Sequence, residues 1–189
     1  MAYNFLSLTN EICGRLNETK LNSSNFASAI NFYSTIKDSL NAAIRDINHQ
    51  EYNYPFNHNT SEIILDTGVA RYPLPQNAKI VDFDNVKILR DDALNVSTRV
   101  LKQIQYNEYT RRYLDDELNT AVTGETPRYI AKSKNNDFVI APKPNKEYTL
   151  ELEYFIVPAD LVLYDDVPTI PESFKHVILD CALSLLYVP

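Results

Sequence analysis

The stretch EYTLELEYFIVPADLVLYDDVPTIPESFKHVILDCALSLL, residues 147–186, contains two hydrophobic periods in succession. In its first part apolar residues alternate with polar ones, as in an antiparallel strand that buries one face; these are Tyr148, Leu150, Leu152, Tyr154 and Ile156. In its last part apolar residues recur at helical spacing; these are Phe174, Val177, Ile178, Cys181, Ala182, Leu185 and Leu186. The stretch therefore predicts a strand followed by a C-terminal helix.

A capping-box pattern marks the expected start of that helix. Thr169 and Glu172 have the spacing of a capping box, and Pro171 falls in the first turn between them. We therefore expect the helix to begin at about residue 170.

The N-terminal section has the period of a helix throughout. Phe5, Leu8, Ile12 and Leu16 predict a first helix, and the polar segment NETKLNSS follows them. A longer apolar stripe runs from residue 26 to residue 47, with Ser23 or Ser24 available to cap its first turn. The two helices are expected to form a hairpin, which ends before Pro55 because proline cannot continue a helix.

The middle section changes to the period of strands. The segments SEIILDTG, STRVLKQI, RYIAKSK and DFVIAP each predict a strand, and YNEYTRRYLDDEL predicts a short helix across the sheet. Within KIVDFDNVKILRDD, Val81 and Phe83 have the opposite parity to Val86 and Ile88. We therefore expect two short strands there, separated by a break near Asp84–Asn85.

These elements predict an α+β fold with a small antiparallel helical bundle, in which the N-terminal hairpin packs on the C-terminal helix. An antiparallel β domain is inserted into this bundle. The expected bounds are 1–58 and 168–189 for the bundle and 59–167 for the β domain, with its short helix near 106–118.

The composition narrows the possible functions. The chain has 189 residues and a formal net charge of −7, which disfavours a dedicated nucleic-acid clamp because such a clamp needs a basic face. Neither a signal peptide nor an apolar run of about 20 residues is present, so we expect no membrane segment. Cys13 and Cys181 are expected to be buried, apolar residues on helices.

The sequence gives little indication of catalysis. The three glycines are isolated, and the three histidines have no metal-ligand spacing, so neither a cofactor nor a metal is expected. Asp82 and Asp84 are the best pair of carboxylates, and they suggest a cell-wall hydrolase as one alternative. However, an alternation that buries Val81 and Phe83 turns both aspartates toward solvent, and we expect no enzyme.

The charges are unevenly distributed along the chain. Residues 128–146 have a net charge of +4, and residues 147–189 have a net charge of −7. One interpretation is ordinary solvated charge, and the other is a head-to-tail contact between copies, which can close into a ring. The candidate basic contact residues are Lys132, Lys134, Lys143 and Lys146.

The end of the chain is also apolar. Leu185, Leu186, Tyr187 and Val188 close the last helix with almost nothing after them to cover it. Either Leu185 and Leu186 pack into the core of this chain, or the four residues contact a partner.

The order of several segments resembles one known family. These segments are FLSLTNEICGRLNE, NFYSTIKDSLNAAIRDINHQEYNYPFN, YPLPQNAKIVDFDNVKIL, YNEYTRRYLDDE, GETPRYIA, DFVIAPKPNKEYTLELEYFIVPADL and DDVPTIPESFKHVILDCALSLLY. Their succession is similar to the head-to-tail adaptors of short-tailed bacteriophages, of the tail tubular protein A type. Two departures are the absence of tryptophan at Tyr54-Pro55-Phe56 and the lack of an extension after the last helix.

The resemblance implies a structural virion protein at the head-tail junction, made in the host cytoplasm. Such adaptors form a twelve-membered ring between the portal protein and the tail nozzle or tube, and DNA passes through the channel without sequence-specific binding. They use no cofactor. The adaptor interpretation has two alternatives: the cell-wall hydrolase named above and a soluble binding module unrelated to phage.

Overall fold

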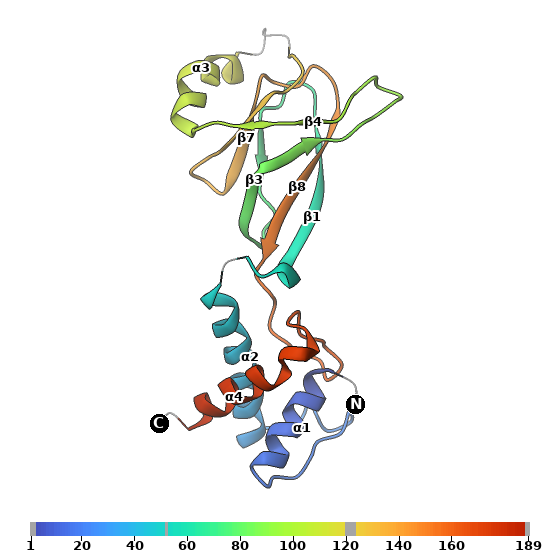
Figure 1. The fold of residues 1–189 in the computed structure, drawn as a ribbon, viewed down its shortest axis with the longest axis vertical. Coiled ribbons are helices and arrows are strands. Elements are labelled where there is room, and N and C mark those ends of the chain that lie inside the picture. The colour runs from blue at the N-terminus through green and yellow to red at the C-terminus, as the bar shows by residue number, and fades with distance from the viewer. Residues whose placement is uncertain (1–2, 52, 120–123, 188–189) are drawn as a thin grey trace. The chain divides into compact units, whose positions relative to one another are not determined.

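The computed structural model describes residues 3–51, 53–119 and 124–187 (Figure 1). The chain divides into two compact units, one made of Met1–Asn57 with Val157–Pro189 and the other of His58–Ile156. We call them the helical unit and the β unit. The fold is α+β, as the sequence predicts.

The helical unit contains three α-helices and two single turns of 3₁₀ helix among its described residues. They are α1 (Phe5–Arg15), α2 (Phe32–Gln50), η1 (Pro55–Asn57), η2 (Glu172–Phe174) and α4 (Lys175–Leu186) (Figure 1). Their apolar faces share one core, in which Leu8, Leu40 and Ile178 are fully buried. Burial of one such side chain stabilises a fold by about 1.5–3 kcal/mol, so this core holds the helices together.

The beginning of α1 is fixed by a capping box. The Asn4 side chain accepts a hydrogen bond from the Ser7 backbone N–H at 2.9 Å, and the Ser7 hydroxyl accepts one from the Asn4 N–H at 3.1 Å. These bonds satisfy two of the backbone donors at this end of α1. The helix ends at Arg15, close to the end of the predicted apolar stripe.

The second helix begins later than the sequence predicts. The Asn22 side chain accepts hydrogen bonds from the backbone N–H groups of Ser24 and Asn25, so residues 23–28 form turns. Asn31, with φ of 58° and ψ of −124°, then precedes α2 in a conformation that an α-helix does not contain. The expected cap at Ser23 or Ser24 was therefore wrong, although Phe26 is still buried against Phe5.

The last helix also begins later than predicted. Pro171 has an extended conformation, η2 follows it, and α4 starts at Lys175 without a side-chain cap. The Thr169 hydroxyl is buried and has no hydrogen-bond partner, so the predicted capping box with Glu172 was wrong. Pro171 disfavours a helical conformation at Ile170, which agrees with the absence of a helix start there.

Residues 157–167, which we expected in the β domain, lie in the helical unit. The Asn41 side chain accepts a hydrogen bond from the Leu161 N–H at 2.9 Å and donates one to the Leu161 carbonyl at 3.0 Å. The Phe5 N–H donates to the Asp166 carbonyl at 2.8 Å. These bonds attach the segment to α2 and to the start of α1.

The described residues of the β unit form two four-stranded sheets. Its strands are β1 (His58–Leu65), β2 (Arg71–Pro73), β3 (Ala78–Ile88), β4 (Arg99–Val100), β5 (Lys102–Gln103), β6 (Tyr129–Lys132), β7 (Asp137–Ala141) and β8 (Tyr148–Ile156). The strand order is β1-β8-β3-β4 in one sheet and β2-β7-β6-β5 in the other (Figure 1). Among these named strands, all pairings are antiparallel except that of β5 with β6.

The two strands expected between residues 78 and 88 are one irregular strand. The register of β3 on β8 shifts between Asp82 and Lys87. At this irregularity the Asp82 carboxylate accepts hydrogen bonds from the Asp84 backbone N–H at 3.0 Å and from the Asn85 amide at 2.7 Å. The change of parity that we interpreted as a break is therefore the change of face that an irregularity produces.

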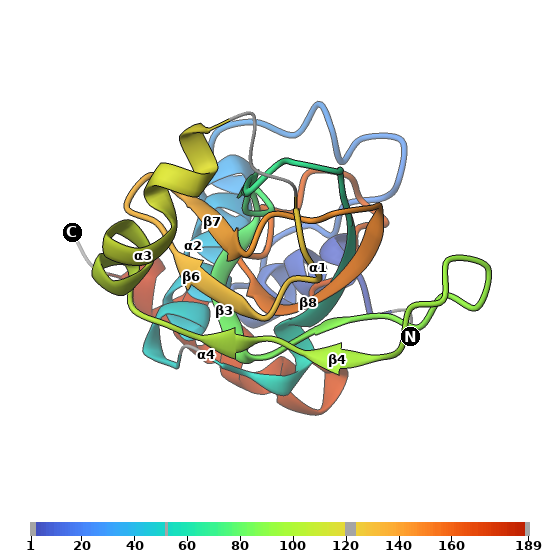
Figure 2. The ribbon, with the colours of Figure 1, turned by 90° about the horizontal axis from the view of Figure 1, so that it is seen from above.

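The α-helix of this unit, α3 (Tyr106–Leu118), covers the outer face of the second sheet (Figure 2). Tyr109 is buried there against β6 and β7, together with Ala131 and Val139. The other faces of these strands contribute Ile130 and Phe138 to the core between the sheets. One face of β7 is covered by α3 and the other by the first sheet, which explains why the strand is apolar on both faces.

High pH is expected to destabilise the β unit through Tyr72. Burial raises the pKa of this phenol to about 12, and its hydroxyl donates to the carbonyls of Asp66 and Val69. A raised pKa contributes stability that is present below pH 10 and lost as the pH rises toward 12.

The measurement is urea unfolding of the wild type and Tyr72→Phe at pH 9 and pH 11. We expect the fall in unfolding free energy over this interval to be smaller in Tyr72→Phe by about 1 kcal/mol. Tyr187→Phe is the matched control, because that ring is exposed. Equal falls in wild type and Tyr72→Phe would contradict the assignment.

Candidate functional site

The helical unit carries an apolar groove of about 490 Å³. Its walls come from three places: α2, the segment around η1, and the segment from residue 170 into α4. The principal lining residues are Ile47, Tyr54, Phe56, Ile170, Phe174 and Val177. The rings of Tyr54 and Phe56 are stacked with centroids 4.8 Å apart.

The sequence pattern did not identify this groove. Helical spacing assigned Phe174 and Val177 to the buried stripe of α4, but they are 50% and 41% exposed. Because α4 begins only at Lys175, the stripe extends past the core at its N-terminal end. Exposed apolar side chains that line a concave surface are typical of a protein-binding site.

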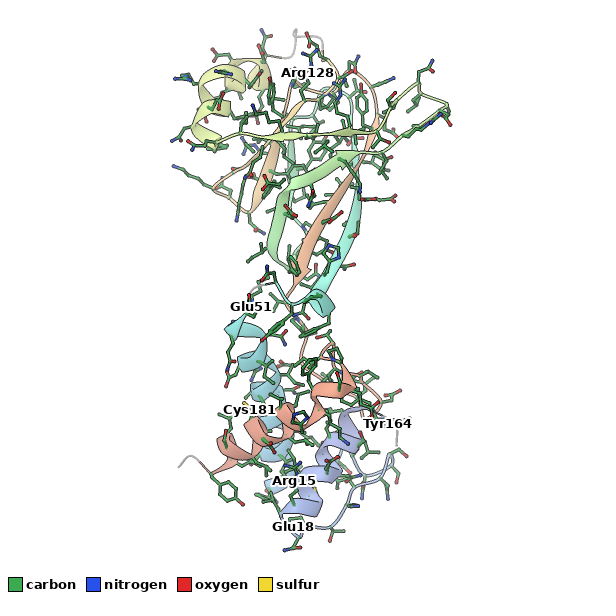
Figure 3. All side chains as sticks on the ribbon, viewed as in Figure 1. Arg15, Glu18, Glu51, Arg128, Tyr164 and Cys181 are labelled. Atoms are coloured by element: carbon green, nitrogen blue, oxygen red, sulfur yellow. The ribbon has the colours of Figure 1, made fainter. Side chains whose placement is uncertain are left out.

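Two ion pairs join α4 to α1. Arg15, which Figure 3 labels, donates to the Asp180 carboxylate at 2.6 Å, and Lys175 forms an ion pair with Glu11. Nearby, burial raises the pKa of the Cys181 thiol above its usual range, as it does for Cys13. Both cysteines are free; Cys13 is buried as expected, whereas Cys181 is only partly buried.

The predicted contact residues at the end of α4 divide into three groups. Leu185 and Leu186 are partly buried and pack against the helical core. Tyr187 follows the last turn of α4 and is 73% exposed. Val188 lies outside the described residues.

The four predicted basic contact residues do not form one patch. Lys132 and Lys134 are exposed; Lys132 ends β6 and Lys134 lies in the turn before β7, whereas Lys143 and Lys146 follow the end of β7. A five-residue strand of roughly 15 Å separates the two pairs.

Lys143 and Lys146 also use their ammonium groups within the chain. Lys143 is only 7% exposed and donates to the Asn119 carbonyl at 2.8 Å. Lys146 donates to the Leu94 carbonyl. Of the four lysines, Lys132 and Lys134 are therefore the better candidates for a partner contact.

The β unit has a polar cluster that sequence reasoning missed. Arg71 of β2 donates to Glu117 of α3 at 3.1 Å and to Asp137 of β7 at 3.2 Å, and the Tyr109 hydroxyl donates to Glu117 at 2.8 Å. The hydrogen bond to Glu117 is the main cause of a raised pKa for the Arg71 guanidinium. These contacts hold α3 on the sheet, and we assign the cluster a structural role.

The structure shows where the predicted carboxylate pair lies and whether the described residues group into a metal site. Asp82 stabilises the irregularity in β3, and Asp84 is exposed beside it. Across residues 3–51, 53–119 and 124–187, no three His, Cys, Asp or Glu side chains are grouped so that they could hold a metal ion. In the same residues, no helix is long and apolar enough to span a bilayer.

Comparison with known proteins agrees with the resemblance seen in the sequence. The family model described as SU10 adaptor protein matches residues 3–188, which is nearly the whole chain. A comparison with curated proteins finds no match. The match includes every described element of both units, and it confirms the similarity to phage head-to-tail adaptors. The chain therefore belongs to the SU10 adaptor protein family.

Proposed function

We propose that this chain forms the adaptor ring between the portal protein and the tail nozzle or tube of a short-tailed bacteriophage. The observation that carries the proposal is the family match over residues 3–188. The expected ring has twelve copies at the head-tail junction, as the resemblance implies. The role is structural, with no cofactor.

The helical unit is the proposed portal-binding part. Its groove, defined by Phe174, Val177 and the stacked Tyr54 and Phe56, offers apolar surface that a folded partner can cover. Tyr187 provides a second exposed aromatic at the end of α4. Aromatic side chains that enter pockets contribute disproportionately to binding energy at protein interfaces.

The β unit is the proposed contact region for neighbouring copies and for the tail. Lys132 and Lys134 are exposed there and are available to an acidic partner surface. The net charge of −7 suits a channel for DNA, because a negative lumen repels phosphates and keeps the genome from binding.

A bridging experiment tests this function. The chain, its cognate portal protein and its cognate nozzle protein are mixed in pairs and all together, and complexes are separated by size-exclusion chromatography. We expect portal and nozzle to co-elute only when the chain is present. Co-elution of portal with nozzle in its absence, or failure of the chain to bind either protein, would contradict the proposal.

A further inference from the structure

The apolar groove of the helical unit lies between segments that carry exposed acids. None of its lining residues is charged, and only Gln50 and the Tyr54 hydroxyl bring polar side-chain atoms to it. Glu51 directly follows the lining residue Gln50, and Glu172 directly follows the lining residue Pro171. Neighbouring Cα atoms are about 3.8 Å apart, so these two exposed acids stand at the edge of the groove. We call Glu51 and Glu172 the acidic rim.

Basic residues of the walls do not balance this rim. Residues 46–57, which contribute one side of the groove, contain two acids and no lysine or arginine. Residues 168–177, which contribute the other side, contain Lys175 as their one lysine or arginine, and it forms an ion pair with Glu11 of α1. The surroundings of the groove therefore have a net negative charge at neutral pH.

Contacts within the unit hold the walls of the groove in place. The Tyr3 hydroxyl donates to the Ile170 carbonyl at 2.7 Å, and the Asn57 N–H donates to the Tyr54 carbonyl at 2.9 Å. The Tyr54 ring in turn stacks on Phe56. Because a preformed groove loses little conformational freedom on binding, it is suited to a partner segment of defined shape.

The groove and its rim together specify the chemistry of that segment. A charged side chain is excluded from the apolar interior, because burying an unpaired charge is costly. Beside the interior, Glu51 and Glu172 repel acidic residues and attract lysine and arginine. The half-exposed ring of Phe174 adds to this preference, since aromatic faces attract cations. The apolar stems of lysine and arginine can also cover the edge of the groove.

We propose that the groove takes a segment of the portal protein whose apolar side chains are flanked on both sides by lysine or arginine, with no acid among them. The inference rests on the proposed function and adds the chemistry of the portal segment that docks. The apolar side chains fill the groove and supply the affinity. The flanking cations pair with Glu51 and Glu172 and set the position of the segment.

Site-specific photocrosslinking tests the identity of the segment. Gln50 is replaced with the photoreactive residue p-benzoylphenylalanine, and the variant is illuminated while it is bound to its cognate portal protein. We expect an adduct with a portal peptide that has apolar residues between lysines or arginines and no acid among them. The control has the same replacement at Glu18, which lies at the opposite end of the helical unit from Glu51, and it should not label that peptide (Figure 3).

Charge reversal tests the rim. We expect Glu51→Lys/Glu172→Lys to bind portal roughly tenfold more weakly than the wild type at low salt. The difference should shrink as salt screens the rim. Glu51→Gln/Glu172→Gln should lie between the two, because it removes the attraction without adding repulsion. Glu18→Lys is the matched control, since Glu18 is an exposed acid of the same unit outside the groove, and it should bind like the wild type.

The outcomes separate this inference from the proposed function. A crosslink to a second copy of this chain or to an acidic portal peptide would overturn the inference. Wild-type affinity in a Glu51→Lys/Glu172→Lys chain that thermal unfolding shows to be folded would overturn it as well. Both results leave the proposed function standing, because the chain still binds portal. A wild-type chain that binds no portal would overturn both.

Discussion

Replacing Arg71 with alanine is expected to lower the free energy of unfolding of the β unit by about 3 kcal/mol. Arg71 is the only described cation that forms an ion pair with either Glu117 or Asp137. The side chains of these two acids are only 15% and 17% exposed. Without the guanidinium, two poorly hydrated carboxylates lose their partner, and one Asp137 oxygen is already buried without a hydrogen bond.

The measurement is urea unfolding at pH 7, followed by far-UV circular dichroism. Arg90→Ala is the matched control, because Arg90 pairs with Asp92 where both side chains are more than 70% exposed. An exposed pair contributes about 0–1 kcal/mol, so this variant should resemble the wild type. Equal stabilities for the Arg71 and Arg90 variants would show that the cluster does not hold α3 on the sheet.

Replacing Phe174 with glutamate is expected to abolish portal binding while the chain remains folded. The ring of Phe174 is half exposed in the groove, so its loss costs the core little. A carboxylate near the N-terminus of α4 is also electrostatically favourable in the free chain. At the proposed interface, however, the same carboxylate is buried against apolar surface, which is costly in every copy of the ring.

The measurement is co-elution with portal rings, with thermal unfolding as the test of folding. Ile30→Glu is the matched control, because Ile30 is an exposed apolar residue of the same unit outside the groove. We expect Ile30→Glu to bind portal like the wild type. A folded Phe174→Glu chain that binds as the wild type does would remove the groove from the portal interface.

Much of the fold was predictable because its signals are local. The alternation in residues 148–156 predicted β8, and the segment YNEYTRRYLDDEL coincides with α3. The errors occurred where side chains compete with the backbone. Asn22 and Asn31 delay α2, and Asp82 supports an irregularity that resembled a break in the sequence.

The candidate site was less predictable because it depends on what covers each side chain. A helical period assigns Phe174 and Leu185 to the same stripe, but only the packing shows that the first lines a groove and the second contacts the core. No sequence pattern distinguishes Lys143 from Lys132, yet the Lys143 side chain is buried in the structure. Free sheet edges are invisible in sequence because they depend on strand order.

Native mass spectrometry of the portal ring with this chain tests the adaptor role most directly. The account predicts one dominant complex whose mass exceeds that of the portal by twelve copies of 21.7 kDa, with few partially filled rings. A portal spectrum that is unchanged by excess chain, or a broad distribution of one or two bound copies, would contradict the adaptor ring.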